Sequence, residues 1–134
     1  MDGYILVVDD NADVRELMRQ MIDAMSITVR LANDGDQALK AVRDEVPRLI
    51  LLDLMMPEMN GFTVISHLQK EASLRKIPVI VLSSLDVSST NLAKIPSIYH
   101  TIQKGSLEFL QIRDRIREIL DTKEDPKTPN SPDK

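Results

Sequence analysis

The sequence predicts an α/β fold, a single doubly wound parallel sheet of five strands with five flanking helices. Short apolar segments of strand length alternate along the chain with segments whose apolar residues recur every three or four positions, as in an amphipathic helix. The length of 134 residues suits one domain and is too short for two ordinary ones. With 43% hydrophobic and 28% charged residues, the composition is that of a globular protein.

The predicted strands and helices follow one another in strict alternation. The strands cover residues 4–8, 27–32, 49–52, 78–82 and 98–103. The helices cover residues 14–25, 34–46, 62–68, 88–94 and 106–119. Asp34 with Gln37 resembles a capping box, and Ser106 is a good N-cap for the last helix. The fourth helix is expected to be short or frayed, because it is rich in Ser, Thr and Asn and Pro96 follows it.

The polarity of the strands predicts their order in the sheet. Residues 4–8, 49–52 and 78–82 are continuously apolar, which suits central strands that are buried on both faces. Residues 27–32 and 98–103 alternate apolar with polar side chains, as strands at the edge of a sheet do. This pattern fits the flavodoxin-like order 2-1-3-4-5, in which ligands bind at the carboxyl ends of the first and third strands.

The domain is expected to cover residues 1–121. Residues 122–134 hold three of the seven prolines and no large apolar side chain, so they are expected to form a disordered tail or the stub of a linker.

The composition argues against several classes of function. The net charge of −4 disfavours direct binding of nucleic acid, and two Tyr, two Phe and no Trp supply no surface for base stacking. Because the sequence has no Cys, it excludes disulfides, Cys-ligated zinc and thiol catalysis. The apolar runs reach only four or five residues, far below a membrane span, so a cytoplasmic protein without membrane contact is expected.

Three carboxylates are expected to converge where the strand order reverses. Asp9 and Asp10 follow the first strand, and Asp53 follows the third. Carboxylates that lie close together repel one another, and a shared proton or a bound cation relieves the repulsion. With no Cys and no nearby His, the ligand set favours Mg²⁺ or Mn²⁺ over zinc. The alternative for each Asp taken singly is a cap of a turn or helix.

Two further polar residues end strands at the same rim. Ser83 follows the fourth strand, and Lys104 follows the fifth. Taken singly, Ser83 is an ordinary turn residue and Lys104 is a solvated lysine paired with an Asp. Beside the acidic cluster, the lysine could neutralise phosphoryl oxygens and the hydroxyl could donate a hydrogen bond to them. Together these residues favour phosphoryl transfer onto an exposed carboxylate.

From residue 4 to about residue 121, the chain resembles the receiver domains of two-component response regulators. The motif residues are Asp9-Asp10, Asp53-Leu54-Met55-Met56-Pro57-Glu58-Met59-Asn60-Gly61, Ser83 and Lys104. The Asp-x-x-Met-Pro-x-Met-x-Gly run is specific, and the four motif blocks occur in the order and spacing of that family.

The resemblance implies a role for each of these residues. Asp53 would be the phosphoacceptor, and Ser83 and Lys104 would hold the phosphoryl group. The ligands of Mg²⁺ would be Asp10, Asp53, the backbone carbonyl of Met55 and, through water, Asp9. Pro57 and Gly61 would shape the loop after the phosphoacceptor.

The resemblance also implies partners. The donor would be a histidine kinase or a histidine phosphotransfer protein, and phosphorylation would switch the binding of a downstream protein partner or effector domain. The chain would be a regulatory domain and not an enzyme, because it would catalyse only its own phosphoryl transfer and slow dephosphorylation. Self-association as a homodimer is left open.

Two positions depart from the pattern of the family. An aromatic switch residue usually stands three positions before the lysine, and Thr101 stands there in this chain. Tyr99 would lie one pleat earlier on the same strand face and could replace it only with a shifted geometry. A cis proline usually follows the lysine, whereas Gly105 follows here, so a trans peptide bond is expected. These departures leave the phosphorylation site intact and put the usual output switch in question.

Three other functions are compared with the sequence features that they require. A haloacid-dehalogenase-like phosphatase needs a second Asp two residues after the nucleophile, and Met55 stands there. A flavodoxin-like nucleotide binder would need a phosphate-binding loop, but the loop after the first strand is acidic. A receiver-like adaptor that works without phosphorylation is the main alternative, because of Thr101 and Gly105.

A few weaker signals have ordinary explanations. His67 and His100 have no partner at metal-ligand spacing, although His100 could tune an output face. Arg113, Arg115 and Arg117 are interpreted as a solvated helix face, with docking of a partner as the alternative.

Overall fold

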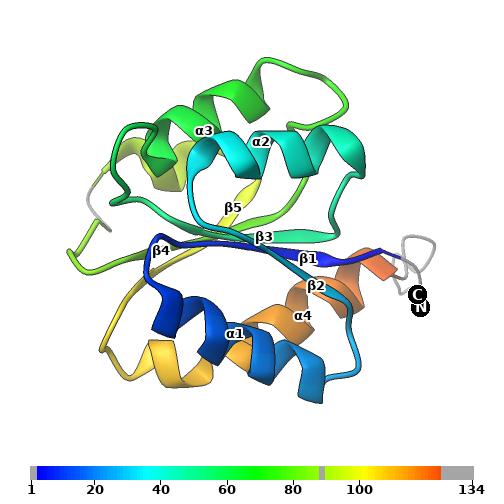
Figure 1. Cartoon of the computed structure of the whole chain (residues 1–134), viewed down its shortest axis with the longest axis vertical. Coiled ribbons are helices and arrows are strands. Elements are labelled where there is room, and N and C mark those ends of the chain that lie inside the picture. The colour runs from blue at the N-terminus through cyan, green and yellow to red at the C-terminus, as the bar shows by residue number, and fades with distance from the viewer. Residues whose placement is uncertain (1–2, 88–89, 125–134) are drawn as a thin grey trace.

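The computed structural model describes residues 3–87 and 90–124, which form a five-stranded sheet between two layers of helices (Figure 1). The strands are β1 (Ile5–Val8), β2 (Val29–Ala32), β3 (Leu49–Asp53), β4 (Val79–Ser83) and β5 (Ile98–Gln103). Their order is β2-β1-β3-β4-β5, and every neighbouring pair is parallel. The predicted strand order is therefore confirmed.

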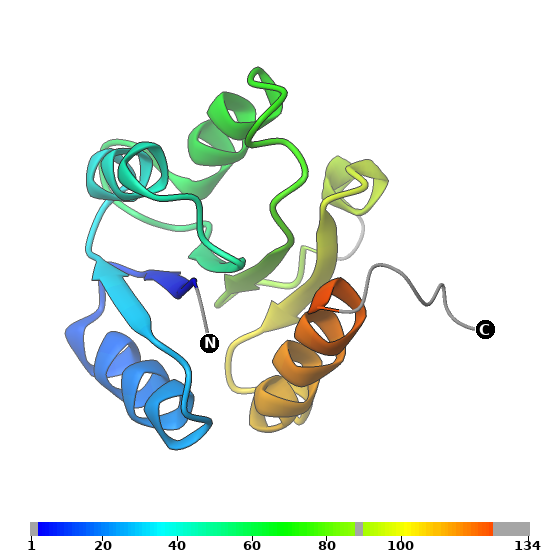
Figure 2. The same ribbon diagram turned by 90° about the vertical axis from the view of Figure 1, so that its right-hand side faces the viewer.

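The described part of the chain has four α-helices and two 3₁₀ helices, of which the last two along the chain follow β5. They are α1 (Ala12–Ala24), α2 (Gly35–Asp44), α3 (Gly61–Gln69), η1 (Asn91–Lys94), η2 (Glu108–Gln111) and α4 (Ile112–Glu124). Helices α2 and α3 cover one face of the sheet, and α1 and α4 cover the other (Figures 1 and 2). Within the described ranges, no helix has the length and apolar character needed to cross a membrane.

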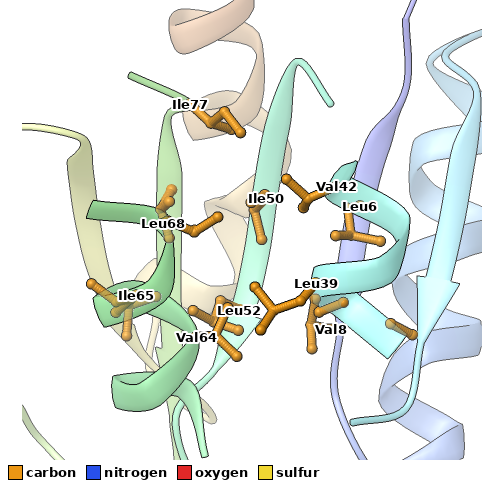
Figure 3. Packing of buried hydrophobic residues seen from close by; sticks show 14 of the residues in the cluster. Leu6, Val8, Leu39, Val42, Ile50, Leu52, Val64, Ile65, Leu68 and Ile77 are labelled. Atoms are coloured by element: carbon orange, nitrogen blue, oxygen red, sulfur yellow. The ribbon is translucent and has the colours of Figure 1, made fainter. Parts of the chain in front are cut away.

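Two apolar cores lie on the two faces of the sheet, because successive residues of a strand point in opposite directions. Leu6 and Val8 of β1 belong to the core under α2 and α3, which Figure 3 shows. Ile5 and Val7 belong to the core under α1 and α4. Every residue of β1, β3 and β4 is buried, whereas β2 and β5 have exposed positions. The assignment of central and edge strands from polarity is thus confirmed.

Polar N-caps fix where three of the helices begin. The side-chain oxygens of Asn11, Asp34 and Asn60 accept hydrogen bonds from backbone N–H groups in the first turns of α1, α2 and α3. The capping box predicted at Asp34 is only half formed. The Gln37 N–H donates to Asp34, but the Gln37 side chain accepts from the backbone N–H of Asn33 rather than from that of Asp34.

The connection between β4 and β5 differs from the prediction of a fifth helix. Among the described residues of this connection, 84–87 and 90–97, the 3₁₀ turn η1 is the one helical segment, so the described part of the chain holds four α-helices and not five. Residues 88–89 of the predicted helix lie outside the described residues. The Thr90 hydroxyl donates to the Val87 carbonyl at 2.6 Å and accepts from the Leu92 N–H at 3.4 Å. Hydroxyl side chains compete in this way with helical hydrogen bonds, and Pro96 disfavours helix immediately before it. The polar residues for which a short or frayed helix was expected therefore form a single 3₁₀ turn.

The last helix begins and ends later than predicted. The Ser106 hydroxyl accepts a hydrogen bond from the Phe109 N–H at 3.2 Å, but η2 follows it, and α4 begins only at Ile112. Helix α4 continues to Glu124, beyond the domain boundary predicted at residue 121. The remainder of the predicted tail, residues 125–134, lies outside the described residues.

A register shift in β5 changes the surroundings of Tyr99. The paired residues are Val79 with Ile98 and Ile80 with His100. Tyr99 is therefore an extra residue without a partner in β4, as in a β-bulge. The regular alternation that would place Tyr99 on the face of Thr101 is broken at this point. The Tyr99 side chain is exposed and lines a hollow near Gln69.

Gly61, the first residue of α3, packs directly against the end of β3. A Cβ atom at this position would lie 2.7 Å from the backbone oxygen of Asp53 and 2.8 Å from the Cα of Leu54. In an open helical position, Gly→Ala stabilises a protein by roughly 0.5–1 kcal/mol. Here the backbone of β3 or α3 must move, and such overpacking costs about 1–3 kcal/mol.

We therefore expect Gly61→Ala to lower the free energy of unfolding by about 1–2 kcal/mol, the balance of the clash and the gain in helix propensity. Urea denaturation followed by circular dichroism measures the change. Ser66→Ala, at an exposed position of the same helix, should stay within about 0.5 kcal/mol of wild type. A Gly61→Ala protein as stable as wild type would show that α3 does not hold the end of β3 in place.

Candidate functional site

Asp9, Asp10 and Asp53 meet at the carboxyl ends of β1 and β3. Pairing of Val8 with Leu52 in the two neighbouring strands brings the residues that follow to the same edge of the sheet. One carboxylate oxygen of each Asp lies within 4.8 Å of the others. Asp9 and Asp53 are buried, whereas Asp10 is exposed. The structure thus brings together the three carboxylates that the sequence places at strand ends.

Lys104 reaches into this acidic cluster from the end of β5. Its Nζ atom lies 2.7 Å from Oδ2 of Asp9 and 3.6 Å from Oδ2 of Asp53. Its backbone N–H donates to the Ser83 carbonyl at 2.7 Å, which ties the start of the side chain to the end of β4. The bond between Lys104 and Gly105 is trans, as predicted, since the described residues include no cis peptide bond. One lysine charge therefore faces two buried carboxylates.

Backbone N–H groups hold the other oxygens of these two carboxylates. Oδ1 of Asp9 accepts from the Asn11 N–H at 2.9 Å, and Oδ1 of Asp53 accepts from the Met55 N–H at 3.1 Å. Each Asp thus forms a turn with the residue two positions on, which aims its second oxygen at Lys104. The Arg15 guanidinium, which is not predicted from the sequence as part of this site, donates to the Asp9 carbonyl at 2.7 Å.

The environment of Asp53 disfavours its charged form. Burial and, next, the charge of Asp9 raise the pKa of Asp53 from 3.8 to about 6. The hydrogen bond from the Met55 N–H and the positive charge of Lys104 lower this pKa, but they do not offset the first two effects. At neutral pH the Asp53 carboxylate is mostly ionised, and its charge is unfavourable. A cation bound beside it would relieve this cost.

Ser83 lies at the end of β4, next to the end of β3. Leu82, the residue before it, pairs with Asp53. The Ser83 side chain is buried, and its hydroxyl oxygen accepts a hydrogen bond from the Leu85 N–H at 3.0 Å. Its hydroxyl proton is therefore not used in that bond, and Ser83 keeps a donor at the rim of the acidic cluster.

The loop after Asp53 is closed by a hydrogen bond from the Gly61 N–H to the Leu54 carbonyl at 3.0 Å. Met55 begins the exposed part of this loop, and its side chain is half-exposed. Glu58, next to Pro57, adopts a left-handed conformation with φ of 64°. That conformation is unfavourable for a residue with a side chain and was not foreseen from the sequence, because Asn and Gly are the usual signals for it.

The weaker sequence signals lie away from the acidic cluster. In the described ranges, the three Asp residues form the only group of three or more His, Cys, Asp or Glu side chains close enough to share a metal ion. His67 lies in α3. Nδ1 of His100 lies 3.9 Å from Oε2 of Glu108. On α4, Arg115 pairs with Glu118 at 2.7 Å, as expected of a solvated helix face.

The sheet and the acidic cluster together define a class of regulatory domain, which comparison of the sequence with known families identifies. Residues 5–121 match the model of the response regulator receiver domain, and the chain belongs to this family. The resemblance inferred from the motif residues is thereby confirmed. Receiver domains are the regulatory domains of two-component signalling, so the chain is a module of phosphorelay signal transduction.

The relatives include full-length regulators and isolated receiver domains. Response regulator PleD of Caulobacter vibrioides is 44% identical over 120 residues, which cover 89% of this chain and 26% of PleD. Response regulator MprA of Mycobacterium ulcerans is 37% identical over 93 residues, which cover 69% of this chain and 39% of MprA. The chain therefore spans only a minor part of these curated relatives.

Solved structures show the same fold. The receiver domain of NtrX from Brucella abortus has a TM-score of 0.74 and 29% identity, with coverage of 88% of this chain and 98% of that domain. Response regulator TrrA of Thermotoga maritima, crystallised in complex with Mg²⁺-BeF, has a TM-score of 0.75 at 24% identity, with coverage of 89% and 100%.

The raised pKa of Asp53 makes stability depend on pH in a defined direction. The unfolded chain ionises this group near its ordinary pKa of 3.8 and the folded protein near 6, so the folded state binds more protons between these values. The free energy of unfolding therefore loses a contribution as the pH rises from about 4 to about 6. A pKa shift of this size corresponds to about 3 kcal/mol at most.

We expect Asp53→Asn to be more stable than wild type at pH 7 in metal-free buffer, by up to about 3 kcal/mol, and the difference to shrink toward pH 4. Urea denaturation across this pH range measures both stabilities. Asp121→Asn, at an exposed position of α4, is the matched control and should show no such trend. A difference that is independent of pH would contradict the assigned cause.

Proposed function

We propose that Asp53 accepts a phosphoryl group from a phosphohistidine of a histidine kinase or a histidine phosphotransfer protein. One observation carries the proposal. The Asp53 carboxylate is ionised at neutral pH although its surroundings disfavour the negative charge. One of its oxygens lies within 4.8 Å of a carboxylate oxygen of Asp9 and of Asp10, and Oδ2 lies 3.6 Å from Nζ of Lys104. Converting the carboxylate to an acyl phosphate moves the negative charge outward to oxygens that Lys104 can reach.

The donor set of the acidic cluster fits Mg²⁺, and Mn²⁺ has the same ligand preference. Three carboxylates supply hard oxygen ligands, and Asp10 is exposed, so the cluster is open on one side. Asp10 and Asp53 would bind the ion directly, together with the backbone carbonyl of Met55, and Asp9 would bind it through water. When bound, the ion would neutralise charge on the transferring phosphoryl oxygens. That the structure of TrrA holds Mg²⁺-BeF supports the choice of metal.

In the transfer, a carboxylate oxygen of Asp53 attacks the phosphorus atom of the donor. The new bond joins that oxygen to phosphorus, and the bond from phosphorus to the donor histidine nitrogen breaks, with its electron pair left on the imidazole. The hydrogen bond from the Met55 N–H holds Oδ1 of Asp53, so Oδ2 is the oxygen better placed to attack. The chain contributes position and charge, as in other phosphoryl transfers.

After transfer, Lys104 and Ser83 would hold the phosphoryl group. Lys104 has to exchange part of its ion pair with Asp9 for the new oxygens, and the Ser83 hydroxyl has to donate to one of them. Both residues end strands whose backbones are joined by the bond from the Lys104 N–H to the Ser83 carbonyl. A change at the phosphoryl group would thus act on β4 and β5 together and alter the binding of a downstream protein or effector domain.

The comparisons do not favour the alternative of an adaptor that works without phosphorylation, since the chain keeps the acidic cluster, Ser83 and Lys104. The departures at Thr101 and Gly105 concern the switch that follows phosphorylation and not the transfer of the phosphoryl group to Asp53. The net charge of −4 disfavours direct binding of nucleic acid by this chain.

Incubation with Mg²⁺ and acetyl phosphate should add the mass of one phosphoryl group to the wild-type protein, because Asp53 attacks small acyl phosphates by the same chemistry. Intact-mass spectrometry measures the gain. Asp53→Asn should show none, and Asp121→Asn should gain mass like wild type. Wild-type protein that binds Mg²⁺ but gains no mass would favour the adaptor.

Lys104→Ala should still fold and bind Mg²⁺, but its structural response to a phosphoryl analogue should be much weaker. Amide chemical shifts in β4, β5 and η2 on adding Mg²⁺ and beryllofluoride measure that response. Lys40→Ala, which removes an exposed lysine of α2, should respond like wild type. An unchanged response in Lys104→Ala would remove the lysine from the proposed switch.

A further inference from the structure

A groove runs between α3 and η1, outside the acidic cluster. Its larger part has a volume of about 770 Å³, and its smaller part, toward the amino end of β5, has about 310 Å³. Both parts are lined by Gln69, whose side-chain amide donates to the Ser97 hydroxyl at 3.1 Å, so they are neighbouring hollows that meet at this side chain. The larger volume lies within the range of roughly 300–1,000 Å³ typical of ligand sites. We call this feature the α3–η1 groove.

The groove exists because a single turn replaces the helix expected between β4 and β5. In a doubly wound sheet, each crossover normally lays a helix over the face of the sheet. Helices α2 and α3 do so for this face, but η1 covers only a short stretch beside them (Figure 2). Ile65 of α3 and Leu92 of η1 belong to the buried core beneath the groove, at 4% exposed each, and its accessible apolar lining is Phe62, which is 44% exposed, and the partly buried Ile95.

The rim of the groove carries positive charge. Lys70, Arg75 and Lys76 line its two parts, and none of the described lining residues is Asp or Glu. The chain as a whole has 21 acidic and 17 basic residues, so this local excess is opposite to the net charge. Apolar walls with a basic rim match the two faces of an amphipathic helix whose polar flanks are acidic.

We propose that the α3–η1 groove binds an acidic amphipathic helix of a partner protein, laid in the place where the fold lacks a helix of its own. Apolar side chains at positions i, i+3, i+4 and i+7 of that helix pack against Phe62 and Ile95, as in other helix-in-groove complexes. Glu or Asp residues beside this stripe face Lys70 and Arg75. The binding does not depend on phosphorylation of Asp53, because Asp53 does not line either part of the groove.

The probe for this proposal is a pair of labelled synthetic helical peptides of about 18 residues, five turns of helix. Both carry Leu at i, i+3, i+4 and i+7, and the flanking positions are Glu in one peptide and Lys in the other. Fluorescence anisotropy with the whole chain should show the Glu peptide binding at least about tenfold more tightly than the Lys peptide. Amide shifts on binding should fall in α3 and η1.

Filling the groove tests where the peptide binds. Ser66→Trp, on the exposed groove side of α3, should lower the affinity for the Glu peptide by at least about tenfold, and Asn91→Trp on the opposite wall should do the same. Thr63→Trp, exposed on α3 but outside the groove, is the matched control and should leave binding unchanged. Circular dichroism and thermal melting establish that each variant is folded.

Reversing a charge tests the choice of an acidic partner. Arg75→Glu should lower the affinity for the Glu peptide and raise the affinity for the Lys peptide. Lys40→Glu, which makes the same change of net charge on α2, should change neither affinity. Equal binding of both peptides, or binding that survives both filling variants, would overturn the proposal. Dimerisation of the wild-type chain that Ser66→Trp abolishes would also overturn it, because a second copy would then be the occupant.

Discussion

The rest of the structure depends on the burial of two carboxylates at the ends of neighbouring strands. Parallel pairing of β1 with β3 leaves Asp9 and Asp53 side by side at the switch point of the sheet, with Asp10 at the opening. Burying an ionised carboxylate costs several kcal/mol unless opposite charge and hydrogen bonds compensate for it. Lys104 supplies one positive charge for two buried negative ones. One negative charge is therefore not balanced by this lysine, and a cation bound at the site would stabilise it.

The two apolar cores are what keep this unfavourable arrangement in place. A slip of β1 or β3 by one residue would separate the carboxylates, but it would also turn Leu6 and Ile50 from one core to the other face of the sheet. Burial of a single side chain of that size is worth about 1.5–3 kcal/mol, and each central strand carries several of them. The cores thus outweigh the local repulsion. Stability distributed over the whole sheet holds a small region in an unfavourable state, which is the usual relation between a fold and its functional site.

Features that depend on the local sequence pattern can be predicted from this sequence, whereas features that depend on contacts between distant segments cannot. The strand order, the two cores and the convergence of the carboxylates depend on apolar periodicity and on which residues end the strands, and both are visible along the chain. The contact of Arg15 with the Asp9 carbonyl depends on how α1 packs, and the left-handed Glu58 depends on how the loop closes onto Gly61. Such features are set by tertiary packing and override local preference. The bulge at Tyr99 belongs to the same group, since a shift of register has no signal in a strand of alternating residues.

The missing helix between β4 and β5 has a local physical cause. Polar residues around Thr90 form hydrogen bonds with their own backbone, so the crossover gains little from helix formation and covers little apolar surface. Ser83 begins this crossover and Lys104 follows β5, so the weakly built segment is attached at both ends to the strands that border the acidic cluster. Segments with few buried contacts rearrange at the lowest free-energy cost. A change of charge at the cluster therefore meets less resistance in this crossover than in the helices that cover β1 and β3.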